Sequence, residues 1–138
     1  MNECLFCGAL SGTPAVVPVW SSESSFAFLD HRPVFKGHVL VIPRTHIEVL
    51  TDLPAAEVGP FFEVVQRMAG AVQGALGAGG TFVAINNRVS QSVPHLHAHV
   101  VPRTKGDGLR GFFWPRTKYA SDEEAASYAA RISAALDA

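Results

Sequence analysis

The feature that most constrains the fold of this chain is a run in which histidine alternates with apolar residues, His95-Leu96-His97-Ala98-His99-Val100-Val101. In a β-strand, successive side chains point to opposite faces. The run therefore predicts a strand with three imidazoles on one face and the side chains of Leu96, Ala98 and Val100 on the other. We expect the apolar face to pack on a helix and the imidazoles to face a cleft.

A helix that could cover this strand is predicted downstream of Pro54. Apolar side chains recur there at steps of three and four residues, which places them on one face of a helix: Val58, Phe61, Phe62, Val65, Met68, Ala69, Val72 and Leu76. Pro54 and Pro60 place the start near residues 54–57, because proline is tolerated in the first turn. The helix is expected to end at a cluster of glycines, Gly77, Gly79 and Gly80.

Four further segments are rich in β-branched and aromatic residues and are expected to be strands: Val16 to Trp20, Ser25 to Asp30, His38 to Ile42 and Phe82 to Ile85. A last helix is predicted to start at Ser121, whose hydroxyl can cap the amide of Glu124 while that glutamate reaches back. Its buried stripe would be Tyr128, Ile132 and Leu136. The predicted fold class is α+β, a mainly antiparallel sheet of about five strands with one long helix and a C-terminal helix.

The length of 138 residues suits one domain with a single core. We expect a short knuckle at 1–12 and a C-terminal loop and helix at 104–138. The formal net charge of −1 argues against a protein that tracks a nucleic-acid backbone. No stretch of about 20 apolar residues is present to span a membrane. The N-terminus lacks the basic and apolar regions of a signal peptide, so a cytoplasmic location without nucleic-acid or membrane partners is expected.

The histidine run is compatible with two kinds of chemistry. One is a three-histidine zinc site like those of metal-dependent hydrolases. The other is nucleophilic catalysis at phosphorus, in which one imidazole attacks and another stabilises the oxyanion. No aspartate follows the run in the pattern of metal-dependent hydrolases, and better metal ligands occur elsewhere in the chain. We therefore favour the second interpretation, with the chemistry carried by the middle histidine, His97.

The better metal ligands are two thiolates and two imidazoles, a set suited to tetrahedral zinc: Cys4, Cys7, His46 and His95. In a chain without an export signal, the C-x-x-C spacing of the cysteines suggests a metal site or a redox pair more than a structural disulfide. The spacing alone leaves zinc, a redox-active pair and a buried pair of thiols open.

Several motifs together resemble the histidine triad (HIT) family. The run at 95–101 is similar to the family signature, and other landmarks follow in the family's order: Phe26-Ala27-Phe28-Leu29-Asp30, Gly37-His38-Val39-Leu40-Val41-Ile42-Pro43 with His46, Ser90-Gln91-Ser92-Val93, and Pro102-Arg103. The resemblance implies the family's α+β fold and a homodimer. It also implies hydrolysis or transfer of nucleoside monophosphates, usually AMP, from a substituted α-phosphate.

The resemblance implies a catalytic role for three residues. His97 would be the nucleophile that forms a nucleotidyl-histidine intermediate, and His99 would hydrogen-bond the α-phosphate. Ser92 would present its hydroxyl and amide near the phosphate and the leaving group. The two cysteines with His46 and His95 resemble the zinc site of bacterial members. With four protein ligands that site would be closed, so its zinc would be structural.

The resemblance also implies a set of substrate-binding residues. Asp30 would hold the ribose hydroxyls and Phe28 would line the base pocket. Asn86 matches a polar position on the phosphate side, and Gln91 belongs to the same turn as Ser92. The residue before Gln91 is usually glycine in the family, and here it is Ser90. His38 is expected to support the cleft, and His31 to be exposed.

The segment after the histidine run combines cations with aromatic residues: Arg103, Lys105, Arg110, Arg116 and Lys118 with Phe112, Phe113 and Trp114. It is either a solvated loop or the border of the leaving-group side of the cleft, where its cations would meet distal phosphates.

Two alternatives to a hydrolase stay open. One is a transferase or phosphorylase that uses phosphate or a sugar phosphate as acceptor, and the other is a zinc-stabilised nucleotide-binding regulator.

Overall fold

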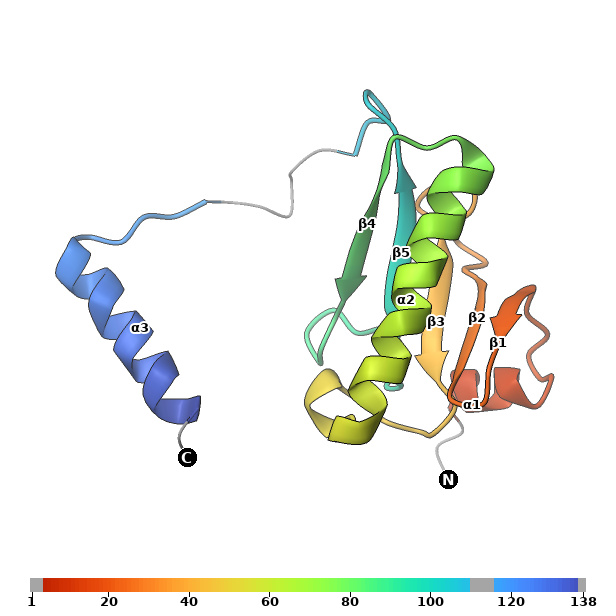
Figure 1. Cartoon of the computed structure of the whole chain (residues 1–138), viewed down its shortest axis with the longest axis horizontal. Helices are drawn as coiled ribbons and strands as arrows, with labels where there is room; N and C mark the ends of the chain where they lie inside the picture. The colour runs from red at the N-terminus through yellow and green to blue at the C-terminus, as the bar shows by residue number, and fades with distance from the viewer. Residues whose placement is uncertain (1–3, 110–115, 137–138) are drawn as a thin grey trace. The chain divides into compact units, whose positions relative to one another are not determined.

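Five strands form one antiparallel sheet in the order β1-β2-β3-β5-β4 (Figure 1). The computed structural model describes residues 4–109 and 116–136, and the chain forms two units, 1–107 and 108–138, each described here by itself. The elements of the first unit are α1 (Leu5–Leu10), β1 (Pro18–Ser21), β2 (Ser25–Leu29), β3 (Val39–Pro43), the 3-10 helix η1 (Leu50–Asp52), α2 (Ala55–Leu76), β4 (Gly80–Ile85) and β5 (Ala98–Arg103). The predicted α+β fold with a mainly antiparallel sheet is confirmed.

Strand β5 carries part of the histidine run and lies inside the sheet, between β3 and β4. Its first residue, Ala98, pairs with Val41 of β3 on one side and with Ile85 of β4 on the other. A strand that is hydrogen-bonded on both edges is a rigid carrier for its side chains. His99 therefore lies on one of the best-fixed parts of the fold, and His97 directly precedes it.

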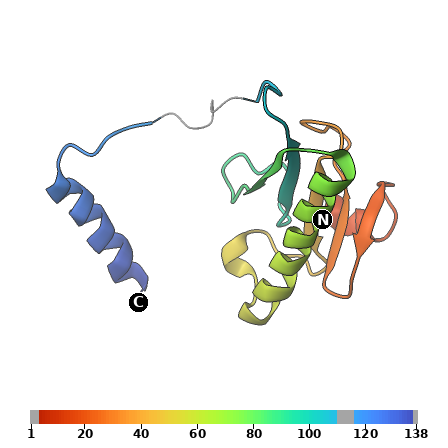
Figure 2. The same ribbon diagram turned by 45° about the horizontal axis from the view of Figure 1, so that its top comes forward.

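Helix α2 covers one face of the sheet (Figure 1, Figure 2). Its buried side chains Phe61, Val65 and Met68 belong to the same core cluster as Leu96 and Val100 of the histidine run. The prediction that the apolar face of the run packs on this helix is confirmed. Three predicted stripe positions, Val58, Phe62 and Leu76, are instead exposed, while Val64 is buried in the core.

The histidine run is strand only in its second half. Strand β5 begins at Ala98, later than predicted, because the Leu96 amide donates to the carbonyl of Ile47 (2.6 Å), which lies outside the sheet. The start of α2 at Ala55 agrees with the prediction. Pro60, however, lies in the second turn of α2, beyond the first turn in which the prediction placed it, and removes one backbone hydrogen bond there.

The second unit contains one helix, α3 (Asp122–Leu136), among its described residues. The Glu124 amide donates to the Ser121 hydroxyl (3.1 Å), as predicted, and the Glu124 carboxylate accepts from the Ala120 amide (2.8 Å). The predicted buried stripe is wrong, because its members Tyr128, Ile132 and Leu136 are 46%, 65% and 81% exposed. No other helix or strand is described in 108–138 that could cover them. None of the described helices combines the length and apolar character needed to cross a membrane.

Candidate active site and metal centre

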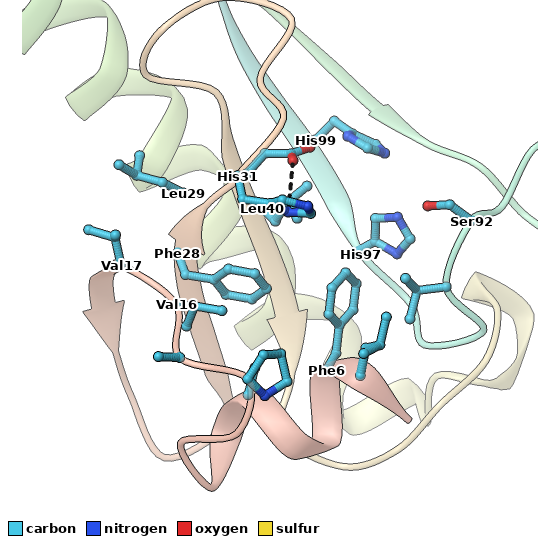
Figure 3. Close-up of a pocket in the computed structure, with 16 residues that line it drawn as sticks. Phe6, Val16, Val17, Phe28, Leu29, His31, Leu40, Ser92, His97 and His99 are labelled. Atoms are coloured by element: carbon cyan, nitrogen blue, oxygen red, sulfur yellow. Dashed lines mark ion pairs between the residues drawn. The ribbon is translucent and has the colours of Figure 1, made fainter. Parts of the chain in front are cut away.

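A pocket of about 650 Å³ lies on the face of the sheet opposite α2 (Figure 3). Its apolar part includes Phe28 and Leu40 from the sheet and Leu5 and Phe6 from α1. Its polar part is formed by Asp30, His31, Ser92, His97 and His99. A pocket with one apolar and one polar part suits a small molecule that has both kinds of surface.

His97 is buried at the polar part of the pocket. Its Nδ1 lies 2.7 Å from the carbonyl oxygen of His95, which can only accept a hydrogen bond. The Nδ1 atom therefore carries a proton, and Nε2 is the nitrogen that can offer a lone pair. The Phe6 ring meets the His97 ring edge-on at 5.0 Å between centroids and restricts its orientation. An imidazole fixed with a free Nε2 lone pair can act as a nucleophile.

His99 lies beside His97, with 5.0 Å between the ring centroids. Its Nδ1 is 3.0 Å from Nε2 of His38, a buried residue directly before β3. Burial, together with the neighbouring His97 and His38, lowers the pKa of His99 to about 4, against the opposing effect of Asp30. Burial also lowers the pKa of His38. Both rings are therefore neutral at neutral pH.

Asp30 directly follows β2 and lines the pocket. Its Oδ1 accepts the amide hydrogen of Arg32 (2.9 Å), which fixes the carboxylate. Its Oδ2 is 3.7 Å from Nε2 of His38. The side chain of His31 is 90% exposed, as expected, although the residue also lines the pocket.

The turn that carries Ser92 is fixed by the side chain before it. Gln91 donates from Nε2 to the carbonyl of Glu48 (2.6 Å), and its Oε1 accepts the amide hydrogen of Arg88 (2.8 Å). Ser90 has a φ of 62°, in the left-handed region that favours glycine. This conformation gives a physical reason for the glycine that the family resemblance leads us to expect at this position.

The structure brings five of the predicted catalytic and substrate-binding residues to one pocket: Phe28, Asp30, Ser92, His97 and His99. Gln91 and Asn86 do not line it, and both amide atoms of the Gln91 side chain are engaged within the protein. A contact of Asn86 or Gln91 with phosphate stays a prediction.

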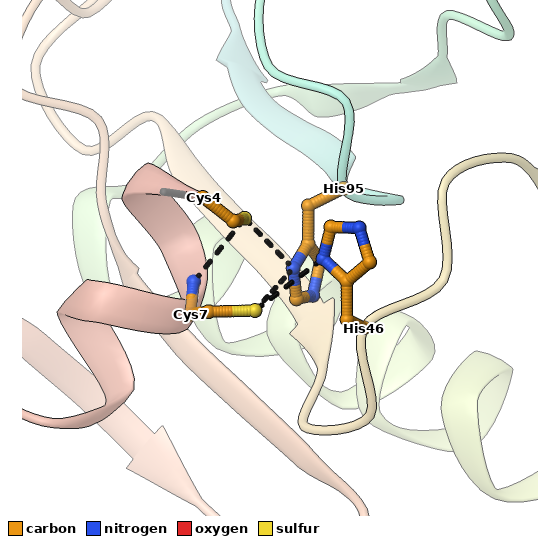
Figure 4. A group of neighbouring side chains, drawn as sticks. All are labelled: Cys4, Cys7, His46 and His95. Atoms are coloured by element: carbon orange, nitrogen blue, oxygen red, sulfur yellow. Dashed lines mark hydrogen bonds between the residues drawn. The ribbon is translucent and has the colours of Figure 1, made fainter. Parts of the chain in front are cut away.

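The four predicted metal ligands lie together beside the start of α1, where Cys4 is the N-cap and Cys7 lies in the first turn (Figure 4). Their ligand atoms all lie within 4.8 Å of one another. Nδ1 of His95 is 3.3 Å from Sγ of Cys4 and 3.6 Å from Sγ of Cys7, and Nδ1 of His46 is 3.3 Å from Sγ of Cys7. Nε2 of His95 donates to the carbonyl of Pro43 (2.8 Å), which leaves the Nδ1 lone pair directed at the thiols.

The donor set fits zinc. Burial raises the pKa of the Cys7 thiol, and the adjacent Cys4 raises it further, because two thiolates side by side repel each other. A divalent cation removes this repulsion and stabilises the thiolate forms. The Cys7 amide also donates to Sγ of Cys4 (3.4 Å), which favours a negatively charged sulfur. Two sulfur and two nitrogen ligands match a closed tetrahedral zinc site.

Phe6 is a residue of the candidate site that the sequence interpretation missed. Its ring lies edge-on to His97, His95 and Phe28, at 5.0, 6.0 and 5.4 Å between centroids, and it lines the pocket. From the sequence we predicted a knuckle at residues 1–12 whose only role was to supply the metal ligands Cys4 and Cys7. The large apolar residues between Cys4 and Cys7 were the available signal, because a knuckle that only binds metal has no need of them.

The cationic and aromatic segment cannot be assigned to the pocket. Arg110, Phe112, Phe113 and Trp114 lie outside the described residues. Arg103 forms an ion pair with Asp107 (2.6 Å) within the first unit. Arg116 and Lys118 are exposed in the second unit.

Comparison with known protein families matches residues 15–106 to the HIT domain. The protein hit of Bacillus subtilis is 38% identical over 116 residues, which cover 82% of this chain and 79% of that protein. An adenylylsulfatase of Arabidopsis thaliana is 28% identical over 78% of this chain and 56% of its own length. An asymmetrical bis(5'-nucleosyl)-tetraphosphatase of Schizosaccharomyces pombe is 33% identical over 64% of this chain and 50% of its own length.

Solved structures extend this similarity over almost the whole chain. A HIT family protein of Bacillus subtilis has a TM-score of 0.84 at 33% identity, covering 96% of each chain. A zinc-bound histidine triad family protein of Mycobacterium smegmatis has a TM-score of 0.73 at 36% identity, covering 96% of this chain and 97% of its own.

Proposed function

The chain belongs to the HIT family, and from this premise we propose that it is a nucleotide hydrolase that acts on the α-phosphate of AMP-linked substrates through a nucleotidyl-His97 intermediate. The substrates would be dinucleoside polyphosphates or nucleoside phosphoramidates. The relatives named as an adenylylsulfatase and a nucleosyl tetraphosphatase support a nucleotide with a substituted α-phosphate as the substrate class.

The observation that carries the proposal is the hydrogen bond from Nδ1 of His97 to the His95 carbonyl. It leaves Nε2 as the nitrogen that can offer a lone pair, at a pocket that also contains a carboxylate and a hydroxyl. Because this hydrogen bond already orients the His97 ring, the nucleophile loses little conformational freedom when it reacts, and this lowers the barrier to attack.

The reaction would proceed in two displacements at the same phosphorus. Nε2 of His97 attacks the α-phosphorus, an N–P bond forms, and the bond from phosphorus to the leaving group breaks. Water then attacks the phosphorus, the N–P bond breaks, and AMP is released with the lone pair of Nε2 restored. His99 would donate to a non-bridging oxygen, and Ser92 would lie near the leaving group.

The remaining pocket residues would bind the nucleoside. Asp30 lines the pocket with a carboxylate that suits the two ribose hydroxyls, because each hydroxyl can donate to it. Phe28 and Leu40 offer an apolar surface for the base, and Phe6 closes it from the side of α1.

Zinc would be held by the two thiolates with His46 and His95, and its role would be structural because all four positions are occupied by protein ligands. The zinc-bound relative of Mycobacterium smegmatis supports this assignment. We further propose that the protein is a homodimer, as the family resemblance implies. We also propose that it is cytoplasmic and that residues 1–138 constitute a single HIT domain.

The test combines a variant with product analysis. Adenosine phosphoramidates, dinucleoside tri- and tetraphosphates, and sulfate- or sugar-linked nucleotides are each incubated with and without phosphate. His97→Ala should lose on the order of 10⁴-fold in kcat while keeping its zinc and its circular dichroism spectrum. Two in-line displacements give net retention at a chiral thiophosphate, so an inverted product would refute the covalent mechanism. ADP formed only with phosphate would indicate the phosphorylase alternative.

A further inference from the structure

The geometry points to His38 as a positioning residue that sets the tautomer of His99, so that His99 presents an N–H group to the pocket. This inference deepens the proposed function, in which His99 donates to the α-phosphate. It assigns a role to a buried histidine that neither attacks phosphorus nor binds metal.

The first step is the tautomer of His38. Its Nδ1 lies 3.1 Å from the backbone amide of Val34, and this amide can only donate. Nδ1 therefore carries the lone pair. A neutral imidazole has one donor and one acceptor nitrogen, so the proton of His38 is on Nε2.

The second step is the tautomer of His99, which follows from the tautomer of His38. Nε2 of His38 and Nδ1 of His99 are 3.0 Å apart, a normal hydrogen-bond distance. Because Nε2 of His38 donates, Nδ1 of His99 accepts. The proton of the neutral His99 ring must therefore be on the Nε2 of His99. Nδ1 is engaged with the buried His38, and His99 is a pocket-lining residue. The backbone of Val34 thus determines which nitrogen of His99 is the donor.

The tautomer of His99 affects phosphate binding because the ring is neutral. A charged imidazole donates from both nitrogens and needs no partner to select one. Burial keeps both His38 and His99 neutral at neutral pH. In the other tautomer, His99 would direct a lone pair at the phosphate oxygen, and the interaction would be repulsive.

A metal ion bound by Asp30, His38 and His99 is the competing explanation, since their ligand atoms lie within 4.8 Å of one another. A metal on Nε2 of His38 would require the proton on Nδ1, where it would oppose the Val34 amide hydrogen. Oδ2 of Asp30 is 3.7 Å from that Nε2, beyond hydrogen-bond distance. The contacts thus favour a chain of hydrogen bonds.

The test measures the tautomer directly by NMR of the ¹⁵N-histidine-labelled full chain at neutral pH, without substrate. We expect the Nε2–H form of His99 in the wild type and in His38→Gln, whose amide can still donate. His38→Leu should populate the Nδ1–H form as well. An Nδ1–H form of His99 in the wild type would overturn the inference, and so would an unchanged tautomer in His38→Leu. Because no substrate is present, these results do not depend on the proposed function.

Kinetics supply the second measurement. His38→Leu should lose on the order of 10²-fold in kcat with a smaller change in KM, as expected when one oxyanion donor is lost, and His38→Gln should recover most of this activity. In a His99→Gln background, His38→Leu should cause little further loss, because it acts through His99. Equal losses in both His38 variants, or full additivity with His99→Gln, would refute the role. Wild-type NMR and His38→Gln decide the matter if His38→Leu does not fold.

Discussion

Burial of His99 should make the protein lose stability as the pH falls from about 6.5 toward about 4. These are the pKa of an ordinary histidine and that of His99 in the folded chain. Between them the unfolded chain binds a proton at this position and the folded chain does not, so stability rises with pH across this window. The stability that the neutral His99 contributes is fully present above pH 6.5. It is lost as the pH falls to the pKa of His99 in the folded chain.

The magnitude follows from the difference between the two pKa values. Each unit corresponds to about 1.4 kcal/mol, so at most about 2 kcal/mol is lost at about pH 5 and at most about 3 kcal/mol at about pH 4, relative to neutral pH. These are upper limits because the His99 ring is partly exposed and solvent screens its charge.

The assay compares urea unfolding of the wild type with that of His99→Gln at several pH values. Glutamine is neutral throughout, so the difference between the two proteins isolates His99 from the other buried histidines and from zinc release. The difference in unfolding free energy should shift in favour of His99→Gln as the pH falls. Parallel stability curves for the two proteins, or an NMR titration of His99 with a midpoint near 6.5, would show that burial does not suppress its protonation.

Three other perturbations test the metal site, the pocket wall and the tail. Cys4→Ser should lower both the zinc content and the melting temperature by opening a closed site, and metal analysis showing one full zinc after this change would contradict the ligand set. Phe6→Ala should weaken AMP binding about tenfold in calorimetry, because the ring forms part of the pocket wall, and unchanged affinity would exclude α1 from the nucleoside site. The double change Arg116→Ala, Lys118→Ala should lower kcat/KM for a dinucleoside tetraphosphate by a few-fold to about tenfold while sparing a small adenosine phosphoramidate. Equal losses on both substrates would mean that the tail only supports the fold.

Local periodicity predicted the parts of the fold that depend on neighbouring residues. Alternation separated Leu96, Ala98 and Val100 from the histidines, and Pro54 and the glycine at 77 marked the ends of α2 within a residue or two. The start of β5 was missed because the Leu96 amide bonds to the distant Ile47 carbonyl, which no local pattern encodes.

In the candidate site, too, the features that depend on contacts between distant residues were the ones not predicted. Residue types together with the family resemblance grouped the four predicted metal ligands, which lie together in the structure. The place of Phe6 beside His97 and the hydrogen bond between His38 and His99 depend on contacts between remote segments. In α3, the stripe of Tyr128, Ile132 and Leu136 correctly indicated an amphipathic face, but such a face does not specify its partner.

The position of β5 has a consequence for how the chain acquires its structure during synthesis. The strand is the last of the five to leave the ribosome, yet its neighbours β3 and β4 both pair with it. Until residues 95–103 emerge, the sheet remains divided, with the pairing edges of β3 and β4 unsatisfied, and such edges favour aggregation of nascent chains. The same nine residues supply His95 to the metal site and His97 and His99 to the pocket. A nascent chain therefore closes its sheet, completes its candidate metal site and gains its candidate nucleophile in one late step.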